Sequence, residues 1–273
     1  MNLRGSFLFG QYLPVESAVH GLDPRTKLLA TLLVVVVLFV VQTFAGLGVL
    51  IVFLAAVTVA GRISPRYVLR GLRPVLWLLA IAIAFQILFG EPGGHPVFHR
   101  GPITITRENL VLGIFYGCRL VLLVIATTLM TFTTSPVELT DGLERLLRPF
   151  RRVGVPAHEL ALMMTIALRF IPTLLEETEK IMKAQMARGA EFSQGGLASR
   201  ARALMPLLVP LFVGAFRRAD ALALAMEARC YRGGNRRTRM RELRMRFRDY
   251  IAGAFVILAA AAALAPGTLW RKL

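Results

Sequence analysis

The sequence predicts an all-α fold, a polytopic membrane helical bundle of about five spans with about three cytoplasmic helices between spans four and five. The first observation is composition: 56% of the 273 residues are hydrophobic and the mean hydropathy is +0.61, too apolar for an ordinary soluble domain. The second is that the apolar residues form runs long enough to cross a bilayer, which takes about 20 residues. The third is a formal charge of +17, which fits basic cytoplasmic loops beside anionic lipid.

An excess of basic over acidic residues is also typical of nucleic-acid-binding proteins. However, the sequence contains no zinc-finger spacing and no aromatic RNA-binding signature. We therefore expect the lipid bilayer, and no nucleic acid, as the partner of these charges. Cys118 and Cys230 are far apart in different kinds of segment, which predicts neither a disulfide framework nor a metal site. The first apolar run begins near Leu28, later than in a signal peptide, so residues 1–27 are expected to remain as a cytoplasmic lead.

Residues 28–132 are expected to contain the first four spans. The apolar stretch 28–60 is too long for one span, and basic residues flank both of its ends. By the positive-inside rule both ends are cytoplasmic, so the stretch should cross twice and turn around residues 42–46. The flanking residues are Arg25 and Lys27 on one side and Arg62, Arg66, Arg70 and Arg73 on the other.

The third span is expected at residues 71–89 and the fourth at residues 109–132, on either side of an external loop. That loop, residues 90–107, is rich in Gly and Pro. Arg119 lies inside the fourth span, where a charge is expensive unless it has a partner. We favour a structural role for Arg119 within the bundle over a contact with another subunit.

Residues 133–249 carry many charges and are expected to form the cytoplasmic helices. Ser135 and Glu138 have capping-box spacing around Pro136, which predicts a helix from there to about Arg148.

Two longer helices are expected at residues 159–187 and 199–229. They are too apolar for water and too short or too charged for ordinary spans, so they should lie along or dip into the membrane interface. The alternative that residues 204–216 form a further span stays open.

The last segment, residues 250–273, is expected to cross at residues 250–264 and to place the C-terminus outside. The run before it, residues 236–248, is strongly basic. We favour a solvated flank of the last span over a lipid-headgroup site for this run, although both use the same electrostatics.

The ends of the two long cytoplasmic helices are alike. The candidate residues are Ala187, Arg188 and Gly189 at one end and Ala228, Arg229 and Cys230 at the other. An arginine suits the negative end of the helix dipole, and a following glycine provides a C-terminal stop. Such ends hold the guanidinium groups in fixed positions, which predicts that both helix ends dock into a soluble partner. The alternative is that both arginines are solvated and only satisfy the dipole.

The sequence contains no recognisable ATP-binding or catalytic motif. It contains no Gly-x-x-x-x-Gly-Lys-Ser/Thr loop for ATP and no paired catalytic groups at membrane depth. The four histidines are scattered, which argues against metal ligation. We therefore expect no catalytic residue, no cofactor and no bound metal.

Several stretches resemble one known family in their order and spacing. They are residues 17–28, 133–136, 167–172, 183–190 and 226–233. Together they resemble the transmembrane T component (EcfT/CbiQ-like) of energy-coupling factor transporters. Cys230 departs from the family pattern, which usually has glycine there. Because cysteine has a Cβ, we expect the second helix to end differently, nearer Gly233 and Gly234.

The resemblance implies a non-catalytic subunit of a prokaryotic inner-membrane transporter. Such a subunit would transmit the motion of two ATP-binding cassette ATPases, one on each coupling-helix tip, to a substrate-capture membrane subunit. The cargo would be a vitamin or a transition-metal ion. From the residues alone, a stand-alone transporter and a non-transport scaffold remain alternatives, and an intramembrane enzyme lacks its catalytic groups.

Overall fold

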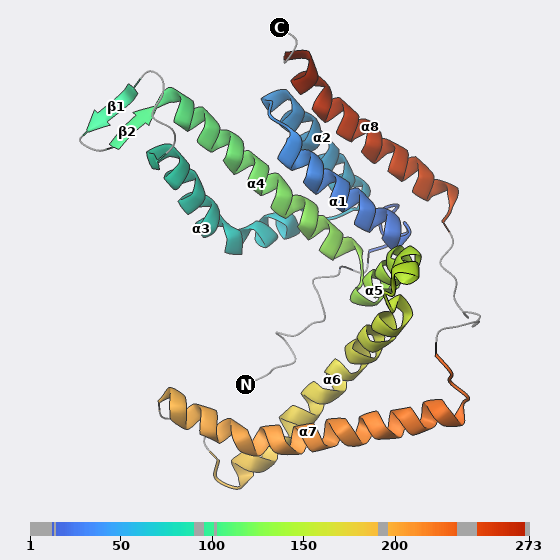
Figure 1. Ribbon diagram of the computed structural model, residues 1–273. Helices are drawn as coiled ribbons and strands as arrows, with labels where there is room; N and C mark the ends of the chain where they lie inside the picture. The colour runs from blue at the N-terminus through green and yellow to red at the C-terminus, as the bar shows by residue number, and fades with distance from the viewer. Residues whose placement is uncertain are drawn as a thin grey trace. The chain divides into compact units, whose positions relative to one another are not determined.

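The computed structural model describes residues 13, 15–89, 96–100, 103–190, 196–233 and 245–270. Within these ranges the chain forms eight α-helices and one β-hairpin (Figure 1). In chain order they are α1 Pro24–Val40, α2 Phe44–Ala60, α3 Pro65–Phe89, β1 Pro96–Arg100, β2 Ile103–Thr106, α4 Arg107–Thr133, α5 Pro136–Leu147, α6 Ala157–Ala187, α7 Leu197–Ala228 and α8 Phe247–Trp270. The predicted all-α helical class is confirmed.

The chain divides into two compact units. The first comprises Met1–Gly142 and Glu242–Leu273, and it contains α1 to α4, the hairpin, the first part of α5 and α8. The second, Leu143–Arg241, contains the end of α5, a 3-10 turn at Arg148–Val153, and helices α6 and α7.

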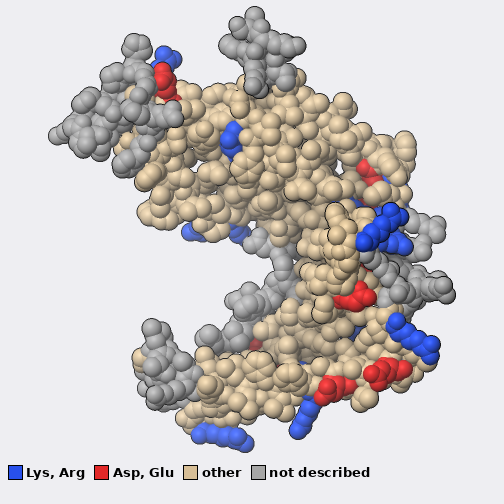
Figure 2. All heavy atoms as spheres, in the orientation of Figure 1, with Lys and Arg blue, Asp and Glu red and all other residues tan. Residues whose placement is uncertain are grey.

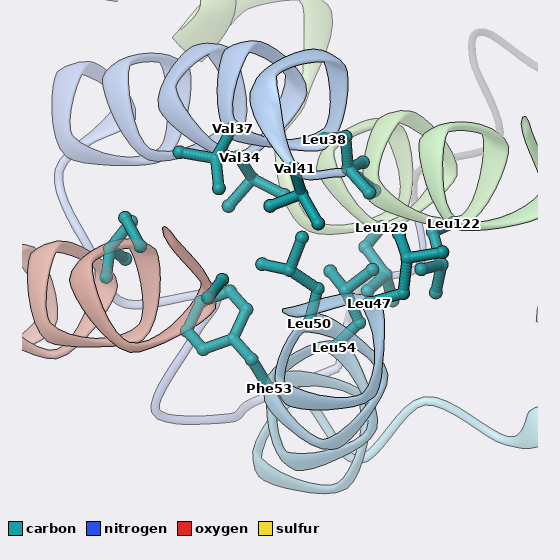
Figure 3. Packing of buried hydrophobic residues seen from close by; sticks show 14 of the residues in the cluster. Val34, Val37, Leu38, Val41, Leu47, Leu50, Phe53, Leu54, Leu122 and Leu129 are labelled. Atoms are coloured by element: carbon teal, nitrogen blue, oxygen red, sulfur yellow. The ribbon is translucent and has the colours of Figure 1, made fainter. Parts of the chain in front are cut away.

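The core of the first unit lies where α1, α2, α4 and α8 meet. Leu38 of α1 and Leu50 of α2 are fully buried there, and Leu122 and Leu129 of α4 close one side (Figure 3). Gly46 lets α2 approach α8 closely, because a Cβ at this position would lie 2.4 Å from the carbonyl oxygen of Ala263. The outer faces are apolar as well, and the face of this unit visible in Figure 2 is almost entirely uncharged. Apolar residues both inside and outside are typical of helices that pack in lipid.

Four described helices are long and apolar enough to cross a membrane: α3, α4, α6 and α8. Helix α2 is apolar but has 17 residues, the same length as α1. The division of residues 28–60 into two short helices is confirmed, with Val41, Gln42 and Thr43 between them. Helix α6 qualifies by length and composition although we assigned it to the cytoplasmic region, and that assignment stays a prediction.

The segment expected to be an external loop at residues 90–107 contains the antiparallel hairpin β1–β2 in its described part, which the sequence analysis did not predict. The strand signal in this segment is the alternation Ile-Thr-Ile-Thr at Ile103–Thr106, which is shorter than the surrounding run of Gly and Pro residues. β-Branched residues of this kind favour extended strands.

The capping box predicted before α5 is present. The backbone N–H of Glu138 donates to Oγ of Ser135, and the N–H of Ser135 donates to Oε2 of Glu138, both at 3.3 Å. Pro136 occupies the first helical position, where its missing N–H costs nothing.

A buried polar cluster joins three distant parts of the first unit. The ammonium of Lys27, which is 6% exposed, donates to the carbonyl of His20 at 2.9 Å and to that of Thr133, the last residue of α4, at 2.8 Å. The N–H of Asp23 donates to Oδ1 of Asp249 at 2.7 Å, which ties the start of α1 to the first turn of α8. Burial, followed by the nearby Lys27 charge, lowers the pKa of His20. These bonds give Asp23 and Lys27 a structural role in joining the bundle.

Replacing Lys27 by Met should destabilise the bundle, because two buried carbonyl groups lose their donor at a cost of roughly 1–3 kcal/mol each. Thermal unfolding of the purified protein in detergent should show a midpoint several degrees lower, at about 2–4 °C per kcal/mol. Lys180→Met changes an exposed lysine and serves as the control. Equal midpoints for the two variants would contradict the role of Lys27.

Candidate docking site

The C-terminal end of α6 is closed by a Schellman motif. The N–H of Gly189 donates to the carbonyl of Met186, and the N–H of Ala190 donates to that of Gln185, both at 3.0 Å. Gly189 has φ +87°, the left-handed conformation that this motif requires. Arg188 is therefore the last residue before a sharp and specified stop.

The end of α7 has the same motif. The N–H of Cys230 donates to the carbonyl of Glu227 at 2.8 Å, and the N–H of Tyr231 donates to that of Met226 at 3.0 Å. Cys230 itself adopts φ +57°, so the expectation that this helix ends nearer Gly233 was wrong. The two closing hydrogen bonds hold a cysteine in a conformation that costs a non-glycine residue about 1–2 kcal/mol.

All six predicted docking residues are exposed. They lie at the two helix ends in matching order: Ala187, Arg188 and Gly189, then Ala228, Arg229 and Cys230. Among the residues that the structure describes, neither Arg188 nor Arg229 has an ion-pair partner. Both guanidinium groups are thus available to a carboxylate or a helix-end carbonyl of another protein.

Helices α6 and α7 cross and pack against each other (Figure 1). Beside the contact is a mostly apolar cavity of about 310 Å³, lined by Ile166, Phe170 and Leu174 of α6 and by Ala215, Leu222 and Met226 of α7, among others. At its edge Nη2 of Arg218 lies 2.5 Å from Oε2 of Glu177. Gly214 leaves room for this pair, since a Cβ there would lie 3.0 Å from Oε1 of Glu177. The sequence analysis does not predict this contact, because Glu177 and Arg218 are 41 residues apart and no local pattern links them.

Arg119 contacts the bundle that surrounds it. Nη2 donates to the carbonyl of Val41 at the end of α1. The guanidinium carbon also lies 4.9 Å from the ring centroid of Phe115 and 5.3 Å from that of Tyr116, within the range of cation–π attraction. These contacts give Arg119 a function inside the subunit, closing the turn between α1 and α2.

No group of three or more potential metal ligands is present within the described ranges. His95 lies outside those ranges.

Comparison with known proteins decides the family. Residues 16–240 match the CbiQ family, described as cobalt transport protein. The chain is 53% identical over 261 residues to the energy-coupling factor transporter transmembrane protein EcfT of Thermosediminibacter oceani, covering 96% of this chain and 98% of the relative. It is 48% identical to EcfT of Clostridium kluyveri and 46% identical to EcfT of Bacillus subtilis, in each case over more than nine-tenths of both chains.

The chain belongs to the EcfT/CbiQ family. It is the transmembrane T component of an energy-coupling factor transporter, a non-catalytic and multi-pass membrane subunit. The resemblance inferred from the residues is confirmed. The two arginine-tipped helices of this T component lie within the matched region.

Exchanging the residues at the two left-handed positions should shift local stability in opposite directions. Cys230→Gly relieves backbone strain and should slow amide hydrogen exchange at the end of α7 about fivefold, for a gain of about 1 kcal/mol. Gly189→Cys adds the same strain to α6 and should speed exchange there. Unchanged exchange at both ends would show that the left-handed closures are not strained by a side chain.

The pair of Glu177 and Arg218 should contribute a coupling energy of about 0.5–1 kcal/mol, the size expected for a partly exposed ion pair. We expect Glu177→Gln and Arg218→Gln to be less than additive in the thermal unfolding midpoint of the T component. Exposed Arg217, replaced by Gln together with Glu177→Gln, provides the control and should be additive. Additive effects for both combinations would mean that the pair does not stabilise the crossing.

Proposed function

We propose that this T component couples two ATP-binding cassette ATPase subunits to a membrane subunit that captures the substrate. The observation that carries the proposal is the pair of exposed, arginine-bearing helix ends closed by the same backbone motif. Each end would occupy a socket on one ATPase, with Arg188 in one and Arg229 in the other. A guanidinium group can form two parallel hydrogen bonds to a carboxylate, which fixes orientation as well as affinity.

Motion would pass through the helices that carry these ends. Closure of an ATPase dimer would move both ends together, and the contact between α6 and α7 would turn that movement into a displacement of their apolar faces. Exposed apolar side chains on both helices support a contact with lipid or with a second membrane protein. Examples are Met163 and Met164 on α6 and Val209, Phe212 and Phe216 on α7.

The proposed orientation places both helix ends and the N-terminal lead in the cytoplasm, and the C-terminus outside. Its support is the basic character of the segments beside the proposed cytoplasmic ends of the helices, including Arg62, Arg66 and Arg248. Cytoplasmic helix ends can meet ATPases that draw on cellular ATP. The chain itself lacks a phosphate-binding loop, so the partners would supply the hydrolysis.

Removing either tip arginine should uncouple transport. In proteoliposomes containing the T component with its ATPase and capture subunits, Arg188→Ala and Arg229→Ala should each lower ATP-driven uptake by roughly tenfold or more, as expected for a central interface arginine. The double variant should be inactive yet retain the unfolding midpoint of the wild-type protein. Arg217→Ala, on the exposed surface of α7, is the matched control.

Normal ATP-driven uptake by the double variant would refute the docking assignment. Uptake by the T component alone would favour a stand-alone transporter. Binding of the ATPases without any effect of ATP on the complex would favour a scaffold.

A further inference from the structure

The first unit contains a large apolar groove between α1, α2, α4 and α8. Its volume is about 510 Å³, within the range of roughly 300–1,000 Å³ that is typical of small-molecule sites. The rings of Phe53 and Phe255 meet within the lining at a centroid distance of 5.6 Å. The walls include Ala30 and Val34 of α1, Val57 of α2, Met130 of α4 and Ala252 of α8.

One end of the groove carries two basic side chains. Lys27 and Arg248 both line it. The Lys27 ammonium is already bonded to two backbone carbonyls. The nearby carboxylates of Glu138, Asp249 and Asp23 also offset its charge, so Arg248 is the better placed cation for an anionic ligand. Arg248 is exposed and has no ion-pair partner among the residues described. In the sequence Arg248 ends the basic run 236–248, which increases the positive charge near this position.

The proposed orientation also gives the groove a position along the bilayer normal. It is lined by the beginning of α1, the ends of α2 and α4 and the beginning of α8, which the orientation proposed above places together in the cytoplasmic half of the bilayer. Arg248 lies one residue inside the start of α8. The proposed orientation would place this helix start near the phosphates of the cytoplasmic leaflet. An apolar slot beside a cation at this level matches an acyl chain joined to an anionic headgroup.

We infer that this groove binds one anionic phospholipid of the cytoplasmic leaflet, with an acyl chain between α1, α2 and α8 and the phosphate beside Arg248. The inference uses the proposed orientation but none of the proposed ATPase contacts. Its test therefore needs no partner subunit and can fail independently of the uptake experiment.

The first experiment adds defined lipids to the delipidated full-length chain in detergent. Phosphatidylglycerol should raise the thermal unfolding midpoint by roughly 5–10 °C at about 100 times the dissociation constant, and native mass spectrometry should show one retained lipid. Phosphatidylcholine with the same acyl chains should have a clearly smaller effect. Equal shifts with the two lipids, or no shift with either, would overturn the inference.

The second experiment fills the groove. Ala252→Phe places a ring in the slot and should abolish both the retained lipid and the midpoint shift, whereas Ala254→Phe, at an exposed position of the same helix, should keep both. If Ala252→Phe does not fold, Val57→Phe tests the opposite wall. Equal lipid binding by the groove-filled variant and the Ala254→Phe control would overturn the inference.

The third experiment removes the charge. Arg248→Gln should bring the midpoint shift with phosphatidylglycerol down to the level seen with phosphatidylcholine. Arg66→Gln removes an exposed arginine elsewhere in the first unit and should preserve the preference for the anionic lipid. A preference that survives Arg248→Gln would contradict the assignment of the headgroup site.

Discussion

The buried ammonium of Lys27 sets the geometry on which the bundle depends. A charge that is 6% exposed must be bonded, and its partners are the carbonyl of His20 in the lead and that of Thr133 at the end of α4. The adjacent bond from Asp23 to Asp249 adds the start of α8 to the same point. Helix α5 begins three residues after Thr133, at a capping box, so its origin is fixed by the same cluster. A small polar cluster thereby determines where the segment leading to the second unit leaves the bundle.

Helix ends in this chain are specified by backbone hydrogen bonds more than by the residue at the left-handed position. Helix α2 ends with Arg62 at φ +52°, α6 with Gly189 and α7 with Cys230, and all three have the paired closing bonds of the Schellman motif. The ends of α6 and α7 therefore share a backbone shape while differing in surface chemistry, since one presents a glycine and the other a thiol. Under the proposed docking, the two ATPase sockets could be alike in shape and still distinguish the two helices.

Local signals predicted local structure well, whereas contacts between distant residues escaped prediction. Periodicity, charge and caps located the helices, the division near Thr43 and the box at Ser135, because each signal lies within a few residues of its effect. Cys230 was misjudged because intrinsic preference was weighed without the two hydrogen bonds that oppose it. The hairpin was not predicted because the strand signal of a short β-branched run is weaker than the turn signal of the Gly and Pro residues near it. The contacts of Lys27 with Thr133 and of Glu177 with Arg218 span 106 and 41 residues, and a single sequence contains no signal for them.

In the proposed function the second unit would act as a lever, and the ends of its helices differ from their crossing in the contacts that hold them. Each arginine-bearing helix end is closed by two backbone hydrogen bonds, and under the proposed docking a force at the guanidinium would enter the helix through this closed turn. The contact between α6 and α7 is different: small residues such as Gly214, Ala215 and Ala219 lie along it, and one partly exposed ion pair crosses it. Such a pair is worth about 1 kcal/mol or less. Relative motion of the two helices would therefore concentrate at the crossing, where the cavity of about 310 Å³ leaves room for side chains to shift.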